Sequence, residues 1–358
     1  MNKLSAISKF LGHSLLNLKP LLDSSVQNSV LTFLDDDIIR PRLNEQYYSW
    51  THYGIFIPNL PEPHRYLNIT ILLGTPSALA FDHDQLIKDK KSPRHTATFF
   101  SSTAATTDSF LKAYDFDGEC EFTENGDLIR LGNDLKIYGE LPYIKLKGQY
   151  LGLYFDFDLD VTRHVSWFLK NPIYDHFSLL SKISGTLTDT TKTYDIQDLC
   201  TYEYARSTGM HSVYSKLLPE HYKIPLDFFT YQIINVNKNT QILLTKADIL
   251  GKAATYTAHI RHLNKQAEVY TDVEFKILKY NDKPQISPYG EAMKIPKTFQ
   301  WIVKDNGVEI INILADCDAT FQYGHGRGYA TSYRYKGVLK SENIKGIAYM
   351  EYINLQSN

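Results

Sequence analysis

From Tyr47 onward the sequence is a series of short runs rich in aromatic and β-branched residues, separated by turn residues. The clearest run covers residues 153–161, where large apolar residues occupy the odd positions and mainly aspartate occupies the even ones. Such alternation predicts a β-strand with one buried and one solvated face. Asn125-Gly126 and Asn306-Gly307 are hairpin signals that favour antiparallel connections. The pattern therefore predicts an all-β fold of the sandwich or barrel type.

The first 40 residues follow a different pattern. Apolar residues recur at steps of three and four, which predicts an amphipathic helix: Leu4, Ile7, Phe10, Leu11, Leu15 and Leu18. Pro20 is expected to end or interrupt this helix. Residues 1–22 carry Lys3, Lys9 and Lys19 and no acidic residue, so a helix lying on an anionic membrane is one interpretation. A helix docked on the body of the protein is the preferred one.

The middle and the end of the chain resemble each other. Ile196 and Ile344 each begin a block in which an aliphatic residue follows after three positions and a Glu-Tyr pair after seven and eight. The two pairs are Glu203-Tyr204 and Glu351-Tyr352. This repeat predicts two related β domains that close on equivalent hairpins. The expected division is a helical segment at 1–40, a first barrel at 41–206 and a second barrel at 207–358.

Composition narrows the function classes. The 358 residues are 43% hydrophobic and 22% charged, with a net charge of -2, which is typical of a soluble globular protein and does not indicate a nucleic-acid partner. The 26 tyrosines and 18 phenylalanines are an unusual surplus of aromatic residues. Cys120, Cys200 and Cys317 are widely separated, which predicts neither a disulfide framework nor a zinc site. A cytoplasmic protein is expected, membrane-peripheral if the N-terminal helix is interfacial.

The repeat and its closing residues carry a family resemblance. A tandem β-barrel chain with Trp50 near the first strand and a glycine- and tyrosine-rich stretch from Gly328 to Tyr352 resembles the two-domain calycin (lipocalin-like) proteins of the AttH and carotenoid 1,2-hydratase group. It is most similar to an uncharacterised bacterial branch of that group. The resemblance implies two lipocalin-like barrels packed together and an apolar cavity for a lipidic or isoprenoid ligand. Because the group ranges from hydratases to proteins without known activity, no reaction is implied.

Carboxylates beside aromatic residues are the candidates for catalysis. Adding water to an alkene or isomerising it needs a proton donor in a dry cavity, commonly a carboxylic acid with a raised pKa next to aromatic faces. Asp248, Asp272 and Glu274 lie on expected strands of the second barrel and could face its lumen. Asp227 precedes Phe228 and Phe229, and Glu351 lies between Met350 and Tyr352. A salt bridge or a solvated strand face is the alternative role for each acid.

Two further sets of residues are candidates for ligand binding. Arg206, just after the first closing strand, is expected to cover Trp50 in a cation–π contact at one end of the first barrel. His259 is expected to point inward and His262 outward, because a spacing of three on a strand sends side chains to opposite faces. The two rings therefore cannot share a metal ion, and no metal site is predicted.

The glycine-rich segment Gly324–Gly328 has two interpretations. It is expected to be a turn or bulge, since it matches no phosphate-binding sequence. Alternatively, His325 and Arg327 lie at a cavity mouth and bind a carboxylate or hydroxyl of a ligand. Tyr333 is a further candidate for the wall of that cavity.

The sequence thus predicts a protein that binds a hydrophobic small molecule, such as an isoprenoid, fatty-acid or steroid-like compound, in an aromatic cavity within or between two barrels. If the protein is an enzyme, cofactor-free acid-assisted hydration, isomerisation or cyclisation is the expected class, because no nucleotide or metal motif occurs. The alternative is a non-catalytic interaction protein with filled barrels and an N-terminal helix that contacts a partner or a membrane.

Overall fold

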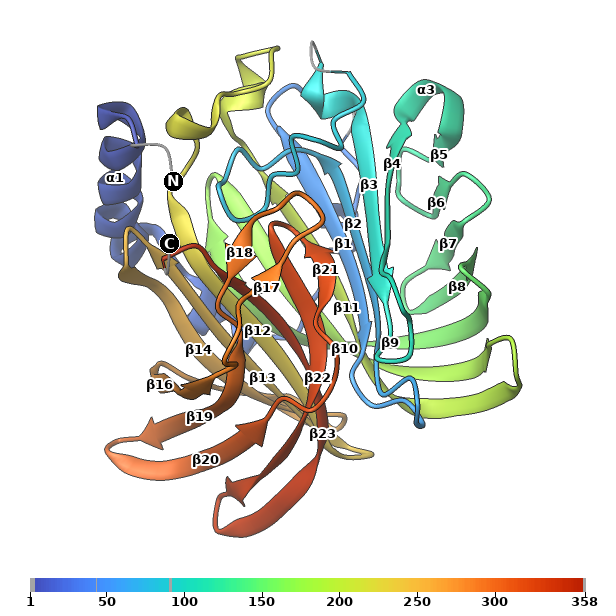
Figure 1. The fold of residues 1–358 in the computed structure, drawn as a ribbon, viewed down its shortest axis with the longest axis vertical. Coiled ribbons are helices and arrows are strands. Elements are labelled where there is room, and N and C mark those ends of the chain that lie inside the picture. The colour runs from blue at the N-terminus through green and yellow to red at the C-terminus, as the bar shows by residue number, and fades with distance from the viewer. Residues whose placement is uncertain (1–3, 43, 90–91, 357–358) are drawn as a thin grey trace.

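The structure is a computed structural model that describes residues 4–42, 44–89 and 92–356. The chain is almost entirely β, and its antiparallel strands form two large barrel-like sheets, one nearly closed and one a half-barrel (Figure 1). The predicted all-β class with two barrels is confirmed. Among the described residues, no helix has the length and apolar character needed to cross a membrane.

The first sheet has eleven strands in the spatial order β4-β3-β2-β1-β11-β10-β9-β8-β7-β6-β5. The bounds of its strands are β1 (Trp50–Ile57), β2 (Leu67–Gly74), β3 (Thr96–Ser102), β4 (Phe110–Asp115), β5 (Cys120–Phe122), β6 (Leu128–Leu131), β7 (Leu135–Glu140), β8 (Tyr143–Tyr150), β9 (Leu153–Asn171), β10 (Tyr174–Thr188) and β11 (Thr193–Ser207). The edge strands β4 and β5 are consecutive in the chain and are joined by the short helix α3 (Phe116–Glu119). The two edges of the sheet therefore meet at α3.

The second sheet has ten strands and also curves into a barrel-like shape. Its main order is β15-β14-β13-β12-β23-β22-β20-β19-β16, and β21 pairs with β22. The bounds are β12 (Leu226–Asn237), β13 (Thr240–Ile249), β14 (Lys252–His262), β15 (Lys265–Tyr270), β16 (Asp272–Tyr280), β19 (Pro296–Asp305), β20 (Val308–Asp316), β21 (Gln322–His325), β22 (Gly328–Leu339) and β23 (Glu342–Asn354). A separate hairpin consists of β17 (Gln285–Ile286) and β18 (Ala292–Met293).

Helices are confined to the N-terminus and the connections. In the described part of the chain they are α1 (Ala6–Leu22), α2 (Ser25–Ser29), the short α3 between β4 and β5, and the 3-10 turns η1 (Asp36–Ile38), η2 (Pro93–His95), η3 (Met210–Ser212) and η4 (Glu220–Tyr222). The expectation that Pro20 ends the first helix is wrong, because α1 continues to Leu22. So close to the helix end, proline removes only one intrahelical hydrogen bond, and the Asp23 N–H still bonds the Lys19 carbonyl at 2.9 Å.

The first helix lies on the body, as preferred from the sequence, but only part of its apolar stripe faces the body. The Ser8 hydroxyl donates a hydrogen bond to the Lys223 carbonyl at 2.6 Å. Gly12 is buried against Pro225, whose Cγ would lie 2.7 Å from a Cβ at that position. Of the predicted stripe, Leu4, Leu11 and Leu15 are half-buried, whereas Ile7, Phe10 and Leu18 are exposed.

Three hydrophobic cores follow from strand alternation. In β9 the odd-numbered residues of 153–161 are buried inside the first sheet, as predicted, and Asp156 on the other face pairs with Lys147 at 2.7 Å. A second core fills the inside of the second sheet and includes Trp301 and Tyr333. The third core lies between the two sheets and contains Phe56, Phe168, Tyr231 and Tyr349, among others. The outer faces of the two sheets therefore pack against each other.

Candidate functional site

The three acids predicted to be catalytic do not converge. Asp272 and Glu274 lie on the solvent face of β16, because the inward positions of that strand belong to Val273 and Phe275. Glu274 pairs with Lys276 at 2.8 Å. Asp248 is buried near the end of β13, where it accepts a hydrogen bond from the Tyr256 hydroxyl at 3.0 Å. The expectation that Asp272 and Glu274 face the lumen is wrong.

The predicted contact between Arg206 and Trp50 is also wrong. Arg206 lies opposite Thr51 across the β1–β11 pair, so its side chain shares the face of Thr51 and not that of Trp50. Its guanidinium lies 5.0 Å from the ring centroid of Tyr48 and pairs with Asp175 at 2.9 Å. Arg206 thus still covers an aromatic ring at one barrel end in a cation–π contact, but the ring is that of Tyr48.

His259 and His262 lie on opposite faces of β14, as predicted, but His259 does not point into the second barrel, because the inward positions beside it belong to Ala258 and Ile260. His259 is fully buried between the sheets, with its ring 6.0 Å from that of Phe168. His262 is partly exposed, and its Nε2 is 3.6 Å from Glu268. Tyr333 is fully buried in the second core, 4.9 Å from the ring of Phe299. A role for His259 or Tyr333 in ligand binding stays a prediction.

The glycine-rich segment forms the turn between β21 and β22, as expected, with Gly326 at a φ of +53°. Arg327 lines a cavity of about 170 Å³, but its guanidinium is bound by Glu220, at 2.9 Å, and by Glu291. His325 is 6% exposed and points away from this cavity mouth toward Glu351, at 3.2 Å between Nε2 and Oε2. His325 therefore belongs to a different, buried group of side chains.

That buried group contains the two glutamates of the internal repeat. In β11, Tyr202 and Tyr204 point into the first core, so Glu203 points to the opposite face, toward the second sheet. In β23, Met350 and Tyr352 point into the second core, so Glu351 likewise points toward the first sheet. Each glutamate is 2% exposed. Equivalent positions of the two closing strands thus bring two carboxyl groups together between the barrels.

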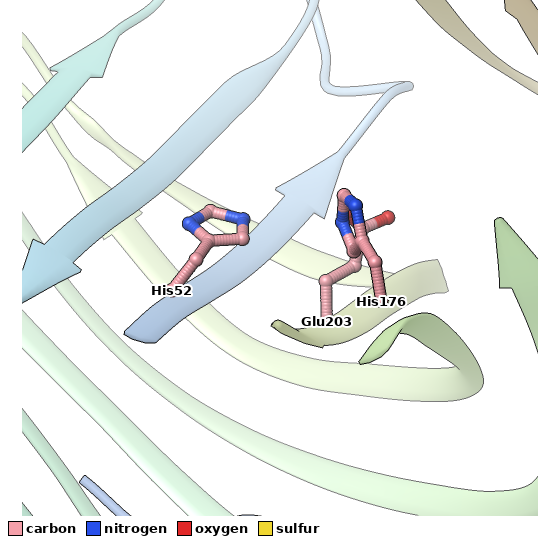
Figure 2. Close-up of side chains that lie close together, drawn as sticks. All are labelled: His52, His176 and Glu203. Carbon is pink, nitrogen blue, oxygen red and sulfur yellow. The ribbon is translucent and has the colours of Figure 1, made fainter. Parts of the chain in front are cut away.

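Two histidines of the first sheet complete this group, which we call the inter-sheet cluster: Glu203, Glu351, His52, His176 and His325. His52 on β1 and His176 on β10 flank the β11 residue Ala205. Their ring nitrogens and a carboxylate oxygen of Glu203 lie within 4.8 Å of one another (Figure 2). His52 Nδ1 is 2.9 Å from the Ile71 carbonyl, and His176 Nδ1 is 3.0 Å from the Tyr174 hydroxyl. Among the described residues, His176 Nε2 has no hydrogen-bond partner.

Burial sets the protonation of the inter-sheet cluster. It raises the pKa of Glu203 to about 7, against the opposing effects of a hydrogen bond from Tyr231 and the charge of Arg261. Burial, with the charge of Glu203 added, raises the pKa of Glu351 well above its usual value. Burial lowers the pKa of His52 to about 4 and that of His325 to about 3. Burial thus favours the neutral form of Glu351 and of the imidazoles in the cluster.

Tyrosine hydroxyls of the second sheet donate hydrogen bonds to both glutamates. The Tyr231 hydroxyl donates to Glu203 Oε1, and the Tyr349 hydroxyl donates to Glu351 Oε1 at 2.9 Å. Tyr231 lies on β12 directly opposite Glu351, so it reaches across the boundary to the glutamate of the other sheet. Arg261, fully buried on β14, donates to the carbonyl and hydroxyl of Ser178 on β10 and supplies a positive charge near Glu203.

Aromatic rings surround the inter-sheet cluster. Phe229 stacks on His325, with ring centroids 5.6 Å apart and planes at 28°. Phe168 meets both His176, at 4.9 Å, and Tyr231, at 5.2 Å. A carboxylic acid next to such rings is placed to protonate an electron-rich group, because aromatic faces stabilise a developing cation.

A cavity of about 350 Å³ approaches the cluster from one end of the first sheet. Its wall includes Tyr48, Lys170, Tyr174 and Arg206. Tyr174 connects this cavity to the cluster, because it lines the cavity and its hydroxyl is bonded to His176 Nδ1. The cavity is in the size range of small-molecule sites.

The trio His52, His176 and Glu203 is also close enough to share a cation (Figure 2). Two neutral imidazoles and one carboxylate would supply a single negative charge to such an ion. The charge of Glu203 is already opposed by the buried guanidinium of Arg261. A divalent cation would therefore add uncompensated positive charge to a dry site, so the residues present fit acid–base chemistry better than metal binding.

Comparison with known proteins places the chain in a family. A profile of a family of unknown function, DUF6670, matches residues 70–358. The chain belongs to this family. No curated protein sequence matches this DUF6670 chain significantly.

Solved structures that share the fold of the DUF6670 chain include the following two. One is an AttH-like protein from Nitrosomonas europaea, with 11% identity and a TM-score of 0.56 over 87% of this chain and 94% of that one. The other is kievitone hydratase from Nectria haematococca, with 12% identity and a TM-score of 0.57 over 92% of this chain and 95% of that one. The resemblance to the AttH and hydratase group is thereby confirmed at the level of the fold.

Proposed function

We propose that this chain binds a hydrophobic alkene, of isoprenoid type, next to the inter-sheet cluster and adds water to the double bond. The observation that carries the proposal is the buried pair Glu203 and Glu351, with three neutral histidines and aromatic walls around it. Both barrel interiors and the space between the sheets are occupied by hydrophobic cores, so we assign the ligand to the cavity of about 350 Å³ whose wall residue Tyr174 is bonded to His176. The hydratase among the structures that share the fold supports the class of reaction.

The protonation states indicate which residue donates a proton and which accepts one. Glu351, whose pKa is raised by burial and by the charge of Glu203, donates its proton to one alkene carbon and leaves a carbocation on the other. The rings of Phe168, Phe229 and Tyr231 stabilise that cation. Water then attacks the cation, and its surplus proton passes to His176 Nε2, which has no hydrogen-bond partner among the described residues. Return of this proton to Glu351 completes one turnover, in which one water molecule is added to the alkene.

The proposal is tested by incubating the protein with kievitone and a panel of isoprenoid alkenes in ¹⁸O-labelled water. We expect a product heavier by one labelled water, and we expect Glu351→Gln to lower its rate at least about a hundredfold. Glu274→Gln, on the solvent face of β16, is the matched control and keeps the full rate. If Glu351→Gln adds water at the wild-type rate, Glu351 is not the proton donor.

Binding is tested separately from turnover. Native mass spectrometry of the gently purified protein, followed by organic extraction, should release a stoichiometric hydrophobic compound. An empty protein that also takes up none of the alkenes would favour the alternative of a non-catalytic interaction protein. The assignment to an uncharacterised bacterial branch of the AttH group is part of this proposal and rests on the sequence resemblance.

A further inference from the structure

The cavity of about 350 Å³ that Tyr174 connects to the inter-sheet cluster has two kinds of wall. One is apolar or aromatic and includes Ile173 and Tyr174. The other is charged and contains Lys170, Asp175 and Arg206. A cavity of this kind suits an apolar ligand with one ionised group. Its volume lies at the lower end of the range of small-molecule sites, which favours a ligand of monoterpene size over a steroid.

Two of the charged groups in this wall are bound to each other. The Arg206 Nε–H donates to Asp175 Oδ2 at 3.0 Å, and Arg206 Nη2 lies 2.9 Å from the same oxygen. The side chains of Arg206 and Asp175 are 17% and 12% exposed, so water competes little for this pair. Hydrogen bonds between two ionised groups are among the stronger ones. The charges of Arg206 and Asp175 therefore cancel at the cavity wall.

Lys170 is the charged group of the wall that keeps its N–H groups available. Its Nζ lies 3.9 Å from Asp175 Oδ1, beyond hydrogen-bonding distance, and 3.9 Å from the ring centroid of Trp167. Within the described part of the chain, no group accepts a hydrogen bond from this ammonium. The ring of Trp167 attracts the charge but leaves the three N–H donors of Lys170 for a ligand.

Other charges near the cavity also form pairs. Asp23, whose Oδ1 accepts a hydrogen bond from the Lys170 backbone N–H at 3.2 Å, pairs with Lys19 at 2.9 Å. Arg42 pairs with Glu45 at 2.6 Å. Over these described residues the charges cancel in pairs, and one positive charge, that of Lys170, remains beside the cavity.

We propose that the alkene bound in this cavity carries a carboxylate, which accepts hydrogen bonds from Lys170 Nζ while the apolar chain lies against Tyr48 and Tyr174. This inference rests on the proposed function and names the class of its substrate as a short isoprenoid carboxylic acid. One surplus positive charge matches one carboxylate, whereas a diphosphate carries several negative charges that the wall does not balance. The inter-sheet cluster adds no further positive charge, because the charge of Arg261 is opposed by that of Glu203.

The test is isothermal titration calorimetry of the full-length protein at neutral pH with geranic acid, geraniol, geranylamine and geranyl diphosphate, which share one carbon chain. Geranic acid should bind at least about tenfold more tightly than geraniol, and geranylamine more weakly than either. Lys170→Met should lower the affinity for geranic acid to that for geraniol, whereas Lys170→Arg keeps the charge and should keep the preference. The matched control is Lys182→Met, which removes an exposed lysine that lies 3.7 Å from Asp160 and should bind all probes like the wild type.

The remaining outcomes separate this inference from the proposed function. Equal affinities of the wild type for geranic acid and geraniol, or tightest binding of geranyl diphosphate, would overturn the carboxylate inference without touching the hydration, which the ¹⁸O assay tests on its own. If none of the probes binds, the cavity is not the ligand site, and both proposals fail. Tight binding of geranic acid without hydration would support the carboxylate site and refute only the reaction. The thermal unfolding midpoint of each variant is the control for folding.

Discussion

Replacing Glu203 by glutamine should change how the stability of the protein depends on pH. Burial raises the pKa of Glu203 in the folded state from 4.5 to about 7. Below pH 4.5 the carboxyl group is protonated in both the folded and the unfolded chain. Between these two values the unfolded chain releases the proton while the folded protein keeps it, so the wild type loses stability as the pH rises. Above pH 7 the loss is complete.

The magnitude follows from the size of the pKa change. A rise from 4.5 to about 7 corresponds to roughly 3 kcal/mol in the free energy of unfolding, a large part of the stability of a typical domain. Glutamine cannot ionise, so Glu203→Gln lacks this loss. The difference in free energy of unfolding, variant minus wild type, should therefore increase by roughly 3 kcal/mol between about pH 4.5 and pH 7.

Urea unfolding followed by tryptophan fluorescence, repeated across this pH range, measures the difference. A change in the hydrogen bond from Tyr231 would shift the free energy of unfolding of the variant by the same amount at every pH, and would not alter its dependence on pH. The buried histidines contribute equally to both proteins and cancel. Glu274→Gln is the control, because that carboxylate is exposed on β16. A difference for Glu203→Gln that is flat across the range would mean that Glu203 is ionised in the folded protein, and the reasoning about the inter-sheet cluster would be refuted.

Three further predictions concern the helix, a buried charge and metal. Gly12→Val should destabilise the protein by about 1–3 kcal/mol in urea unfolding, because its Cβ would lie 2.7 Å from Pro225 Cγ; an unchanged midpoint would mean that α1 does not dock as described. Lys223→Met should cost about 3–5 kcal/mol at neutral pH, since Lys223 lies 2.8 Å from the buried Asp82, and a cost below about 1 kcal/mol would show that the pair is solvated. Dialysis against EDTA should leave the thermal unfolding midpoint unchanged, whereas a fall of several degrees, reversed by added zinc, would assign a metal to the His52 trio.

Local patterns predicted the fold well. The alternation at 153–161 gave the buried and solvated faces of β9 correctly, because a strand's side chains alternate whatever it pairs with. The turn at Gly324–Gly328 and the opposite faces of His259 and His262 were equally local features. The repeat that ends in Glu203 and Glu351 was visible in the sequence as well.

The inter-sheet cluster could not be derived in the same way. Its members come from β1, β10, β11, β21 and β23, and only the pairing of strands far apart in the chain brings them together. The missed signal was an acid at the same position of both closing strands, each flanked by aromatic or aliphatic residues. The inward orientation predicted for Asp272 and Glu274 was wrong because alternation alone does not tell which face of a strand lines the lumen. The predicted contact between Arg206 and Trp50 was wrong because Arg206 pairs with Thr51, and a shift of one residue in register moves a side chain to the other face of the sheet.

The two glutamates belong to different sheets, and the sheets are connected along the chain by residues 208–225. Cutting the chain within that connection would yield two fragments, each with one acid of the pair and with one side of the aromatic lining. Neither fragment alone could combine a proton donor with its partner carboxylate. Reassembly of the fragments would restore the proposed hydration only when both outer faces meet, so the hydration assay would report whether the two halves have joined.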